Sequence, residues 1–520
     1  MYFSPSDTIK YLKEVSEFLK SNPDSEVTLN KGVYHIKTEK SINAMEMLLN
    51  GSWGDNPEKI MFNPRYDYDI GFLLSGIHNC IINAEGVTFM VEGFMEPVSI
   101  RNSNNLTLKG LTIDHLRKPY SFGKITKISE KDGENNIEVT VKLDNNTPIR
   151  EKTPINLRHI FYDTEKDKVI RAKIHKAKFV DEYEISVKMP YSPEIKQGNE
   201  FYTIHTYHSR PAILIENSEN ITLKDISIHS QPGMGIVGNR SENISLIGLK
   251  VIPSENHHFS TNTDATHFTS IKGKLLYDGC TFISQGDDSL NVHSYYHDII
   301  EMLGNNTYRI KENTPGGTHA QTLDYPDEGD TLELTDILTL KVLGEYKAIK
   351  VIPDFENLTT LVTLNKPLPE NTENLVLTDV TRLPKLEIRN CVAKKHFARG
   401  FLVKSRGVII EDNEISEVPL AGIEIAAESN WYEGVSPCDV TIRRNKIYDC
   451  KCGILVKADC KNPEGQSVKN ILIEDNEIYC PQSSNGIIIE NSEKVIIRNN
   501  KILSKDDKVV IKNSSEVEVI

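Results

Sequence analysis

Short apolar segments recur along the chain, and each ends in a polar corner. Four of them share the pattern apolar-x-Ile-x-x-Asn-x-Ile, with Asn413, Asn445, Asn476 and Asn500 at the polar position. A looser version occurs upstream in residues 105–113, 220–228 and 243–251. A unit of about 22 to 32 residues that holds only short strands cannot bury its apolar face alone, so successive units must stack. The pattern therefore predicts an all-β fold, a right-handed parallel β-helix.

The repeated asparagines are expected to be structural. An asparagine at the same corner of every coil tolerates left-handed backbone geometry and can hydrogen-bond to its equivalent on the next coil.

The remaining patterns predict a cap and two insertions. Residues 6–20 form one apolar helical face suited to covering the first coil, made of Ile9, Leu12, Val15, Phe18 and Leu19. Two long segments lack the coil repeat and read as short alternating strands between Asn, Gly and Pro turns, which predicts two inserted small antiparallel β-barrels. The predicted order is a cap with the first coils, a barrel, coils with an acidic cluster, a second barrel and C-terminal coils: residues 1–116, 117–210, 211–293, 294–383 and 384–520.

The net charge and the composition limit the classes of partner and the compartments that the sequence predicts. With 60 Lys and Arg against 74 Asp and Glu, the net charge is -14, which disfavours nucleic acid as a partner. No apolar run approaches the roughly 18 residues of a membrane span, and the N-terminal residues lack the apolar core of a signal peptide. The sequence as written predicts a cytoplasmic protein, or a secreted or periplasmic one if an export signal has been trimmed, and it leaves the oligomeric state open.

Eight cysteines in 520 residues are too sparse for a disulfide framework. Cys450, Cys452 and Cys460 fit no zinc-binding spacing and are expected to be structural.

The chemistry is expected at an acidic cluster, Asp264, Asp287 and Asp288. The first two are separated by the same 23 residues that separate Ile221 from Ile244, so they are predicted to stack on adjacent coils about 4.8 Å apart. Carboxylates that close repel one another, and at least one should hold a proton near neutral pH. The preceding glycine predicts a corner at which both members of the Asp pair face outward.

Three interpretations of this cluster are open from the residues alone. A protonated and an ionised carboxyl group can cleave a glycosidic bond, because one protonates the leaving oxygen and the other activates water. Three carboxylates also suit calcium or another hard cation. The third interpretation is an acidic turn without chemistry.

A family resemblance favours the first interpretation. The run Asn262-Thr263-Asp264 followed by Gly286-Asp287-Asp288 resembles the catalytic signature of β-helical polygalacturonases, glycoside hydrolase family 28. No Gly-His-Gly follows the Asp pair, however, and the Arg-Ile-Lys at residues 309–311 lies inside the second insertion. The chain resembles more closely glycoside hydrolase family 110, inverting α-1,3-galactosidases, through PVSIRNSNNLTLKGLTID, NTD, QGDDSLNVH, HFARGFLVKS and GIEIAAESNWYEG.

That resemblance covers most of the chain and implies roles. Asp287 would be the general acid, while Asp264 and Asp288 would together hold and deprotonate the water. The acid is then expected roughly 6.5 to 9.5 Å from the bases, the separation that leaves room for a water molecule. The implied function is exo-acting, inverting release of terminal α-1,3-linked galactose without a cofactor or metal. The alternatives are a polygalacturonase-like hydrolase of uronides and a non-catalytic β-helix that binds calcium or carbohydrate.

Six further residues are candidates for substrate contact. Trp431 offers an aromatic face for galactose, and its neighbours Glu428 and Glu433 can accept hydrogen bonds from sugar hydroxyls. Arg399 follows the second insertion at the height of the cluster and would bind substrate or moderate the acidic field. His293 follows the Asp pair, and Asp114 ends the last strand before the first insertion.

Overall fold

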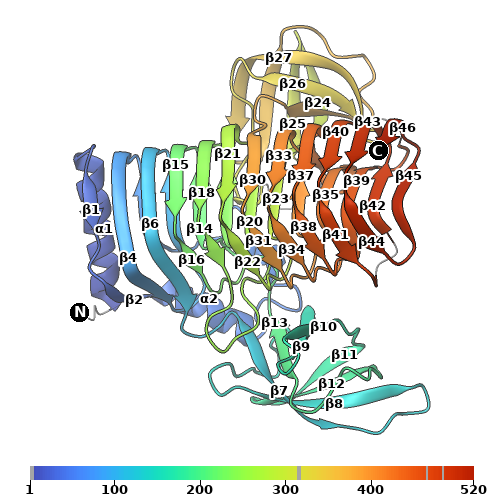
Figure 1. Ribbon diagram of the computed structural model, residues 1–520. Helices are drawn as coiled ribbons and strands as arrows, with labels where there is room; N and C mark the ends of the chain where they lie inside the picture. The colour runs from blue at the N-terminus through green and yellow to red at the C-terminus, as the bar shows by residue number, and fades with distance from the viewer. Residues whose placement is uncertain (1–4, 313–317, 464–466, 483–484) are drawn as a thin grey trace.

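The computed structural model describes residues 5–312, 318–463, 467–482 and 485–520. In those residues the chain winds into a stack of coils, along which a 21-stranded and a 12-stranded sheet run side by side (Figure 1). Neighbouring coil strands pair in parallel, as where Ile221 lies opposite Ile244. The predicted parallel β-helix is confirmed.

The two coil sheets contain most of the strands. The 21-stranded sheet contains β1 (Glu26–Thr28), β2 (Gly32–Ile36), β4 (His78–Val91), β6 (Asn104–His115), β15 (Glu219–Lys224), β16 (Ser227–Ile228), β18 (Glu242–Ile247), β19 (Lys250–Val251), β21 (Lys272–Asp278), β22 (Thr281–Ile283), β30 (Lys385–Arg389), β31 (Val392–Lys394), β33 (Arg406–Glu411), β34 (Glu414–Ser416), β37 (Cys438–Arg443), β38 (Lys446–Tyr448), β40 (Val468–Glu474), β41 (Glu477–Cys480), β43 (Ser492–Arg498), β44 (Lys501–Ser504) and β46 (Ser515–Val519). The 12-stranded sheet contains β3 (Ile70–Ser75), β5 (Glu96–Arg101), β14 (Ile213–Glu216), β17 (Ile236–Asn239), β20 (Thr266–Thr269), β23 (Leu290–Tyr295), β32 (Phe401–Val403), β35 (Ala421–Glu428), β36 (Glu433–Gly434), β39 (Cys452–Asp459), β42 (Asn485–Glu490) and β45 (Asp507–Lys512).

The core runs along the coil axis as rows of equivalent apolar side chains. One row lies on consecutive coils of the 21-stranded sheet and is buried throughout: Ile221, Ile244, Leu275, Leu386, Val408, Val440, Ile471 and Val495. Branched aliphatic side chains fill the space between pleated strands well, and each coil completes the burial of its neighbours.

The repeated asparagines form a buried ladder. The amide nitrogen of Asn413 donates to the side-chain oxygen of Asn445 at 2.9 Å, and that of Asn445 donates to Asn476 at 3.0 Å. The left-handed backbone positions are taken by the preceding residues, such as Arg444 at φ 54°, and not by the asparagines themselves. The predicted hydrogen bonding is therefore confirmed, whereas the predicted left-handed geometry is wrong at these four corners.

We expect Asn445→Ala to destabilise the fold by about 1 to 3 kcal/mol, because it leaves buried groups of Asn413 and Ile410 without their partners. Urea unfolding followed by circular dichroism measures this loss. Asn104→Ala is the matched control, because it removes a similar amide whose bond to Glu219 is solvent-exposed. Equal losses in the two variants would contradict a structural role for the ladder.

A helix covers the first coil. Helix α1 (Pro5–Ser21) buries Leu12 and Leu19 completely, which confirms the predicted cap. Phe18 was expected on the same face but is 50% exposed, because it points away from the coil beneath. Among the described residues, the structure has no helix with the length and apolar character required to cross a membrane.

The two insertions differ in architecture. The first is a seven-stranded antiparallel sheet of β7 (Tyr120–Ile128), β8 (Asn136–Leu143), β9 (Arg158–Asp163), β10 (Lys168–Ile170), β11 (Lys176–Asp181), β12 (Glu184–Pro190) and β13 (Glu200–Ile204). The second is a closed barrel of β24 (His297–Gly304), β25 (Thr307–Glu312), β26 (Thr331–Asp336), β27 (Lys341–Asp354), β28 (Thr359–Leu364) and β29 (Leu375–Asp379).

The barrel prediction is thus confirmed for the second insertion and wrong for the first. The described end strands of the first sheet, β10 and β11, do not pair with each other. Part of that sheet instead packs its Tyr120, Ile160 and Tyr202 against Phe259 of the coils, so its apolar surface is buried without closure.

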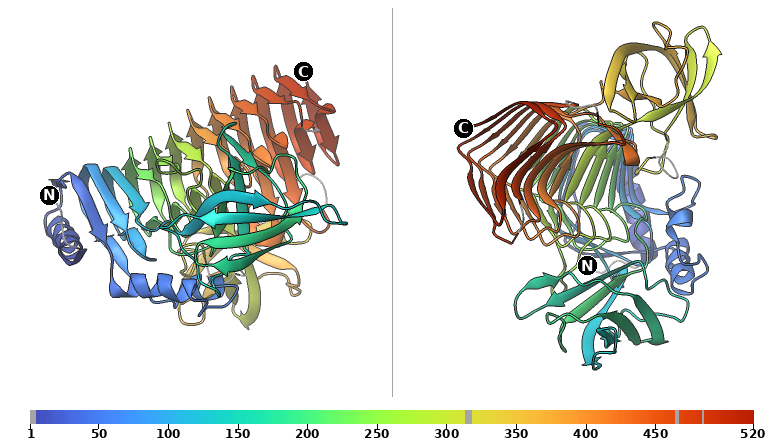
Figure 2. Two further views of the ribbon diagram at one scale, coloured as in Figure 1. Left: turned by 90° about the horizontal axis from the view of Figure 1, so that it is seen from below. Right: turned by 90° about the vertical axis from the view of Figure 1, so that its right-hand side faces the viewer.

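The insertions lie on opposite sides of the coil stack (Figures 1 and 2). The helical segment with α2 (Glu39–Leu49) and α3 (Glu58–Met61), coloured blue, lies beside the stack between them in the end-on view of Figure 2. The coils that carry the acidic cluster lie between the two insertions in the sequence and in space.

Candidate active site

The coil register brings Asp264 and Asp288 together. Strands β20 and β23 pair with Thr266 opposite Leu290, so the coil between them has 24 residues. Asp264 therefore stacks on Asp288, and the prediction that it stacks on Asp287 is wrong by one residue. The backbone N–H of Asp288 donates to Asp264 Oδ1 at 3.1 Å.

The Asp pair lies at a tight corner, as predicted, but only Asp287 faces outward, and the prediction that Asp288 also does so is wrong. A Cβ atom on Gly286 would lie 1.9 Å from the carbonyl oxygen of Asn262, so no side chain fits there. The side chain of Asp287 is 33% exposed beyond this corner, whereas those of Asp264 and Asp288 are 8% and 4% exposed. Of the three carboxyl groups, Asp287 is the one that a substrate can reach most directly.

The three carboxylates are closer together than expected. Their nearest oxygens lie within 4.8 Å of one another. The expected separation of roughly 6.5 to 9.5 Å between acid and bases is therefore wrong for these atoms, because a one-residue corner and one coil spacing are all that divide them.

Burial and mutual repulsion act on the ionisation of the cluster. Burial, and then the charge of Asp287, raise the pKa of Asp264 well above its ordinary value. Burial also raises the pKa of Asp288 well above its ordinary value, although the charge of Arg399 opposes that effect. These directions agree with the expectation that at least one of the carboxyl groups keeps its proton near neutral pH.

Arg399 is the counter-ion of Asp288. Its backbone N–H donates to Asp288 Oδ1 at 2.6 Å, and its guanidinium lies 3.4 Å from Asp288 Oδ2. The same guanidinium donates to Glu428 at 2.7 Å and lies 3.4 Å from Glu424. Of the two roles considered for Arg399, these contacts favour moderating the acidic field.

Lys404 binds the two glutamates predicted near the sugar. This fully buried side chain lies 2.9 Å from Glu428 and 2.7 Å from Glu433. Glu428 lies between Lys404 and Arg399, and its side chain is only 3% exposed. Its carboxylate therefore pairs with these two cations and is not available to accept hydrogen bonds from sugar hydroxyls. Glu433 lies on β36, which folds back antiparallel onto β23.

Two of the remaining candidates, Asp114 and Trp431, make no contact that places them at the acidic cluster. Asp114 is buried and bound by Lys118 at 2.5 Å and by the Ser230 hydroxyl at 2.7 Å. Burial alone would raise its pKa, but these partners bring the pKa below its ordinary value. Trp431 ends a 3₁₀ turn, Ser429–Trp431, and is 68% exposed, so its stacking on a sugar stays a prediction.

Histidines form the wall beside Asp264. His267 Nδ1 lies 2.7 Å from Asp264 Oδ2, and His267 Nε2 lies 2.8 Å from Nε2 of the predicted residue His293. The ring of His319, from the second insertion, stacks on His267 with centroids 3.8 Å apart. His293 is therefore placed beside the acidic cluster through His267.

Other segments complete the surroundings. Arg158 of β9 in the first insertion reaches within 3.7 Å of Asp287. His208, whose Nδ1 lies 2.5 Å from Glu58 of α3, has its pKa raised by that carboxylate against the effect of burial. Phe62 contacts the rings of both His208 and His319. Both insertions and the α3 segment thus border the cluster.

Several residues around the cluster were not predicted from the sequence. His267 could have been found by alternation, because Asn291 and His293 of β23 face the same way as His267 of the paired strand. Arg158, His208 and His319 carry no such signal, because they reach the cluster from insertions and loops whose placement only the folded chain decides.

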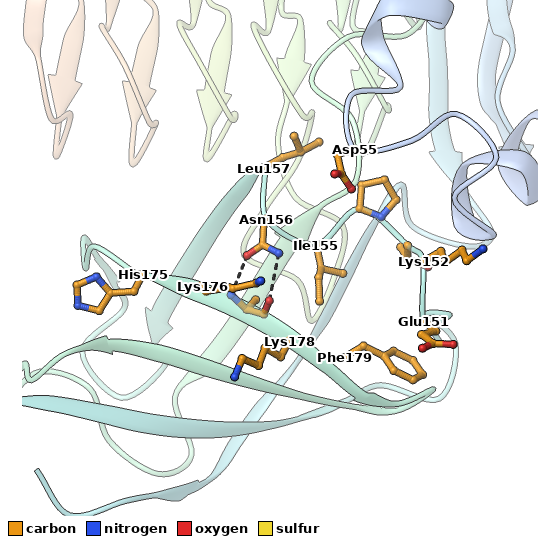
Figure 3. A pocket seen from close by; sticks show the side chains of 13 residues that line it. Asp55, Glu151, Lys152, Ile155, Asn156, Leu157, His175, Lys176, Lys178 and Phe179 are labelled. Carbon is orange, nitrogen blue, oxygen red and sulfur yellow. Dashed lines mark hydrogen bonds between the residues drawn. The ribbon is translucent and has the colours of Figure 1, made fainter. Parts of the chain in front are cut away.

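A separate cavity of about 810 Å³ is lined by the first insertion and by Asp55, which lies between α2 and α3 (Figure 3). At its centre, the side-chain amide of Asn156 pairs with both backbone groups of Ala177 on the end strand β11. The amide closes part of an otherwise open strand edge. None of the residues that line this cavity belongs to the acidic cluster.

Curated relatives resemble the chain over most of its length. Alpha-1,3-galactosidase A of Shewanella woodyi is 25% identical over 473 residues, covering 86% of this chain and 74% of the relative. Alpha-1,3-galactosidase A of Bacteroides fragilis is 26% identical over 509 residues, covering 90% and 81%. Alpha-1,3-galactosidase B of Bacteroides thetaiotaomicron is 25% identical over 508 residues, covering 91% and 80%. The resemblance to α-1,3-galactosidases is confirmed.

Two other comparisons are more limited. A family model described as periplasmic copper-binding protein (NosD) matches residues 362–520, the C-terminal coils and the end of the second insertion. The family 28 exopolygalacturonase of Yersinia enterocolitica aligns with 97% of this chain and 74% of its own, with 9% identity and a TM-score of 0.38. The fold assignment rests on the strand pairing described above and not on that alignment.

Proposed function

We propose that the protein is an exo-acting, inverting glycoside hydrolase that releases terminal α-1,3-linked galactose from oligosaccharides or glycans. The observation that carries the proposal is one reachable carboxyl group, Asp287, directly beside two buried ones of which one is paired with Arg399. The likeness to curated α-1,3-galactosidases over most of the chain supports a galactosidase-type glycoside hydrolase.

Asp287 is assigned as the general acid. It is the carboxyl group nearest to open solvent, and protonating a leaving oxygen requires contact with the glycosidic bond. Asp288 is assigned as the general base, because Arg399 favours its ionised form, and a water molecule held by Asp288 and Asp264 attacks the anomeric carbon.

The way in which the two buried carboxyl groups are held supports an inverting mechanism. Asp264 is bound by His267 and the Asp288 backbone, and Asp288 by Arg399. These contacts disfavour movement of either carboxyl group toward the sugar, which favours water as the nucleophile.

The exo mode is supported by the surroundings of the cluster. An uninterrupted β-helix groove would accept the interior of a polymer. Here Arg158 of the first insertion reaches Asp287, and His319 of the second insertion stacks on His267, which contacts Asp264. Glu58 of α3 binds His208 on a further side. A site enclosed from three sides suits a chain end.

The test is proton NMR on an α-1,3-galactosyl trisaccharide during the first minutes of hydrolysis. We expect β-galactose before mutarotation, together with the disaccharide that remains and no other fragment. An initial excess of α-galactose would contradict inversion, and release of the disaccharide that contains the terminal galactose would contradict the exo mode. Turnover of galacturonan instead of the galactoside would favour the uronide hydrolase.

A further inference from the structure

A chain of hydrogen bonds leads from the acidic cluster into the protein. It joins Asp264 Oδ2 to His267 Nδ1 at 2.7 Å, and His267 Nε2 to His293 Nε2 at 2.8 Å. The chain ends where His293 Nδ1 lies 2.8 Å from the backbone carbonyl oxygen of Ser294. All three side chains are buried, with at most 6% of any residue exposed.

The last bond fixes the direction of the others. A carbonyl oxygen can only accept, so His293 Nδ1 carries a hydrogen and donates it. In neutral His293 the Nε2 atom then accepts, and His267 Nε2 must donate to it. In neutral His267 the Nδ1 atom accepts in turn, which leaves Asp264 Oδ2 as the donor. A carboxyl oxygen donates only when it is protonated.

Burial favours the neutral form of both histidines. Burial lowers the pKa of His267 well below its ordinary value, and the neighbouring His293, Lys404 and His208 act in the same direction while Glu433 opposes them. Burial likewise lowers the pKa of His293, again with Glu433 opposing and Lys404 assisting.

His319, stacked on His267, also has its pKa lowered by burial. Every imidazole in this wall therefore favours its neutral form, and with neutral rings the hydrogen bonds run in the direction derived above.

The spacing suits a hydrogen bond better than a shared metal ion. His267, His293 and His319 each have a ring nitrogen within 4.8 Å of the others. Two nitrogens bound to one tetrahedral zinc lie about 3.3 Å apart, however, whereas the two Nε2 atoms here are 2.8 Å apart. The rings of His267 and His319 are also stacked rather than splayed around a common point.

We infer that Asp264 is a neutral carboxylic acid whose proton is held by His267, with His267 and His293 acting as positioning residues. This inference deepens the proposed function and rests on it for the catalytic role: Asp288 is the ionised base, and Asp264 orients Asp288 and the water without taking a proton. One negative charge fewer in the buried pair also explains how carboxylates stacked on adjacent coils coexist.

Infrared difference spectroscopy tests the protonation without reference to activity. We expect the carbonyl-stretch band of a protonated carboxylic acid in the unmodified protein at neutral pH and its disappearance in Asp264→Asn. The band should shift in His267→Phe, which keeps a ring but removes the acceptor. Absence of the band in the unmodified protein, or no shift in His267→Phe, would overturn the inference even if no galactoside is hydrolysed.

Kinetics with matched variants test the division of roles. The amide of Asp264→Asn can still donate to His267 and accept from the Asp288 backbone, so we expect kcat to fall by about tenfold or less. Asp288→Asn removes the base and should lower kcat by about 10²- to 10⁴-fold. Equal losses in the two variants would overturn the inference while leaving the proposed function standing. No hydrolysis of galactosides by the unmodified protein would refute the proposed function, and the infrared result would still decide the protonation of Asp264.

Discussion

Asp287→Asn should retain the fold and lose about 10²- to 10⁴-fold in kcat on an α-1,3-galactosyl disaccharide, because an amide cannot deliver the proton that the leaving oxygen needs. The change is nearly isosteric. The charged neighbour Arg158 lies 3.7 Å from the carboxylate, beyond hydrogen-bond length, so that contact contributes little to stability. Steady-state kinetics and thermal unfolding of the variant measure the two effects separately.

The leaving group sharpens this test. A p-nitrophenolate departs without protonation, so p-nitrophenyl α-galactoside should lose much less activity than the disaccharide in the same variant. Asp412→Asn is the control, because its side chain pairs with Arg444 on the outer surface of a C-terminal coil. If Asp287→Asn kept more than about a tenth of the activity on the disaccharide, the assignment of the acid would be wrong.

Lys404→Met should lower the free energy of unfolding by about 3 to 5 kcal/mol, because it leaves two buried carboxylates without their shared cation. Lys404 is fully buried and contacts Glu428, Glu433 and the side-chain oxygen of Asn291. Urea unfolding at neutral pH measures the loss. Lys501→Met is the matched control: its bond to Glu477 is 3.0 Å long, but the lysine side chain is 81% exposed, so its removal should cost at most about 1 kcal/mol.

The stability difference between the unmodified protein and Lys404→Met should also change with pH in a defined direction. Burial alone would raise the pKa of Glu433, but the charge of Lys404 is the main opposing effect, and the pKa lies well below the ordinary value of 4.5. A lowered carboxyl pKa contributes stability above that ordinary value, and the contribution is lost as the pH falls through the pKa of the folded state. The difference between the unmodified protein and Lys404→Met should therefore be full at neutral pH and shrink in acid below about pH 4.5. A difference that grows in acid would show that Lys404 acts otherwise than by pairing with carboxylates.

The amino-acid sequence by itself determined the coil architecture, because a period of apolar residues and asparagines repeats wherever a coil adds the same layer to the stack. It also located the three carboxyl groups, since Gly286 and the Asp pair form a local corner that needs no distant partner. Strand alternation correctly predicted the closed barrel of the second insertion. It did not predict the open sheet of the first insertion, because that sheet buries part of its apolar surface against Phe259 of the coils instead of closing on itself.

Only the tertiary structure decided which carboxyl groups stack on each other and which charged neighbours each of them has. Successive coils of the 12-stranded sheet are 23, 30 and 24 residues long. The residue that stacks on Asp264 therefore depends on the length of its own coil, and the 23-residue spacing of another coil misplaced it by one residue. Arg399 and Lys404 come from a coil beyond the second insertion, and Arg158 and His319 come from the insertions themselves. The charge state of a buried carboxyl group is set by desolvation and by neighbours within a few ångströms, and those neighbours are distant along the chain.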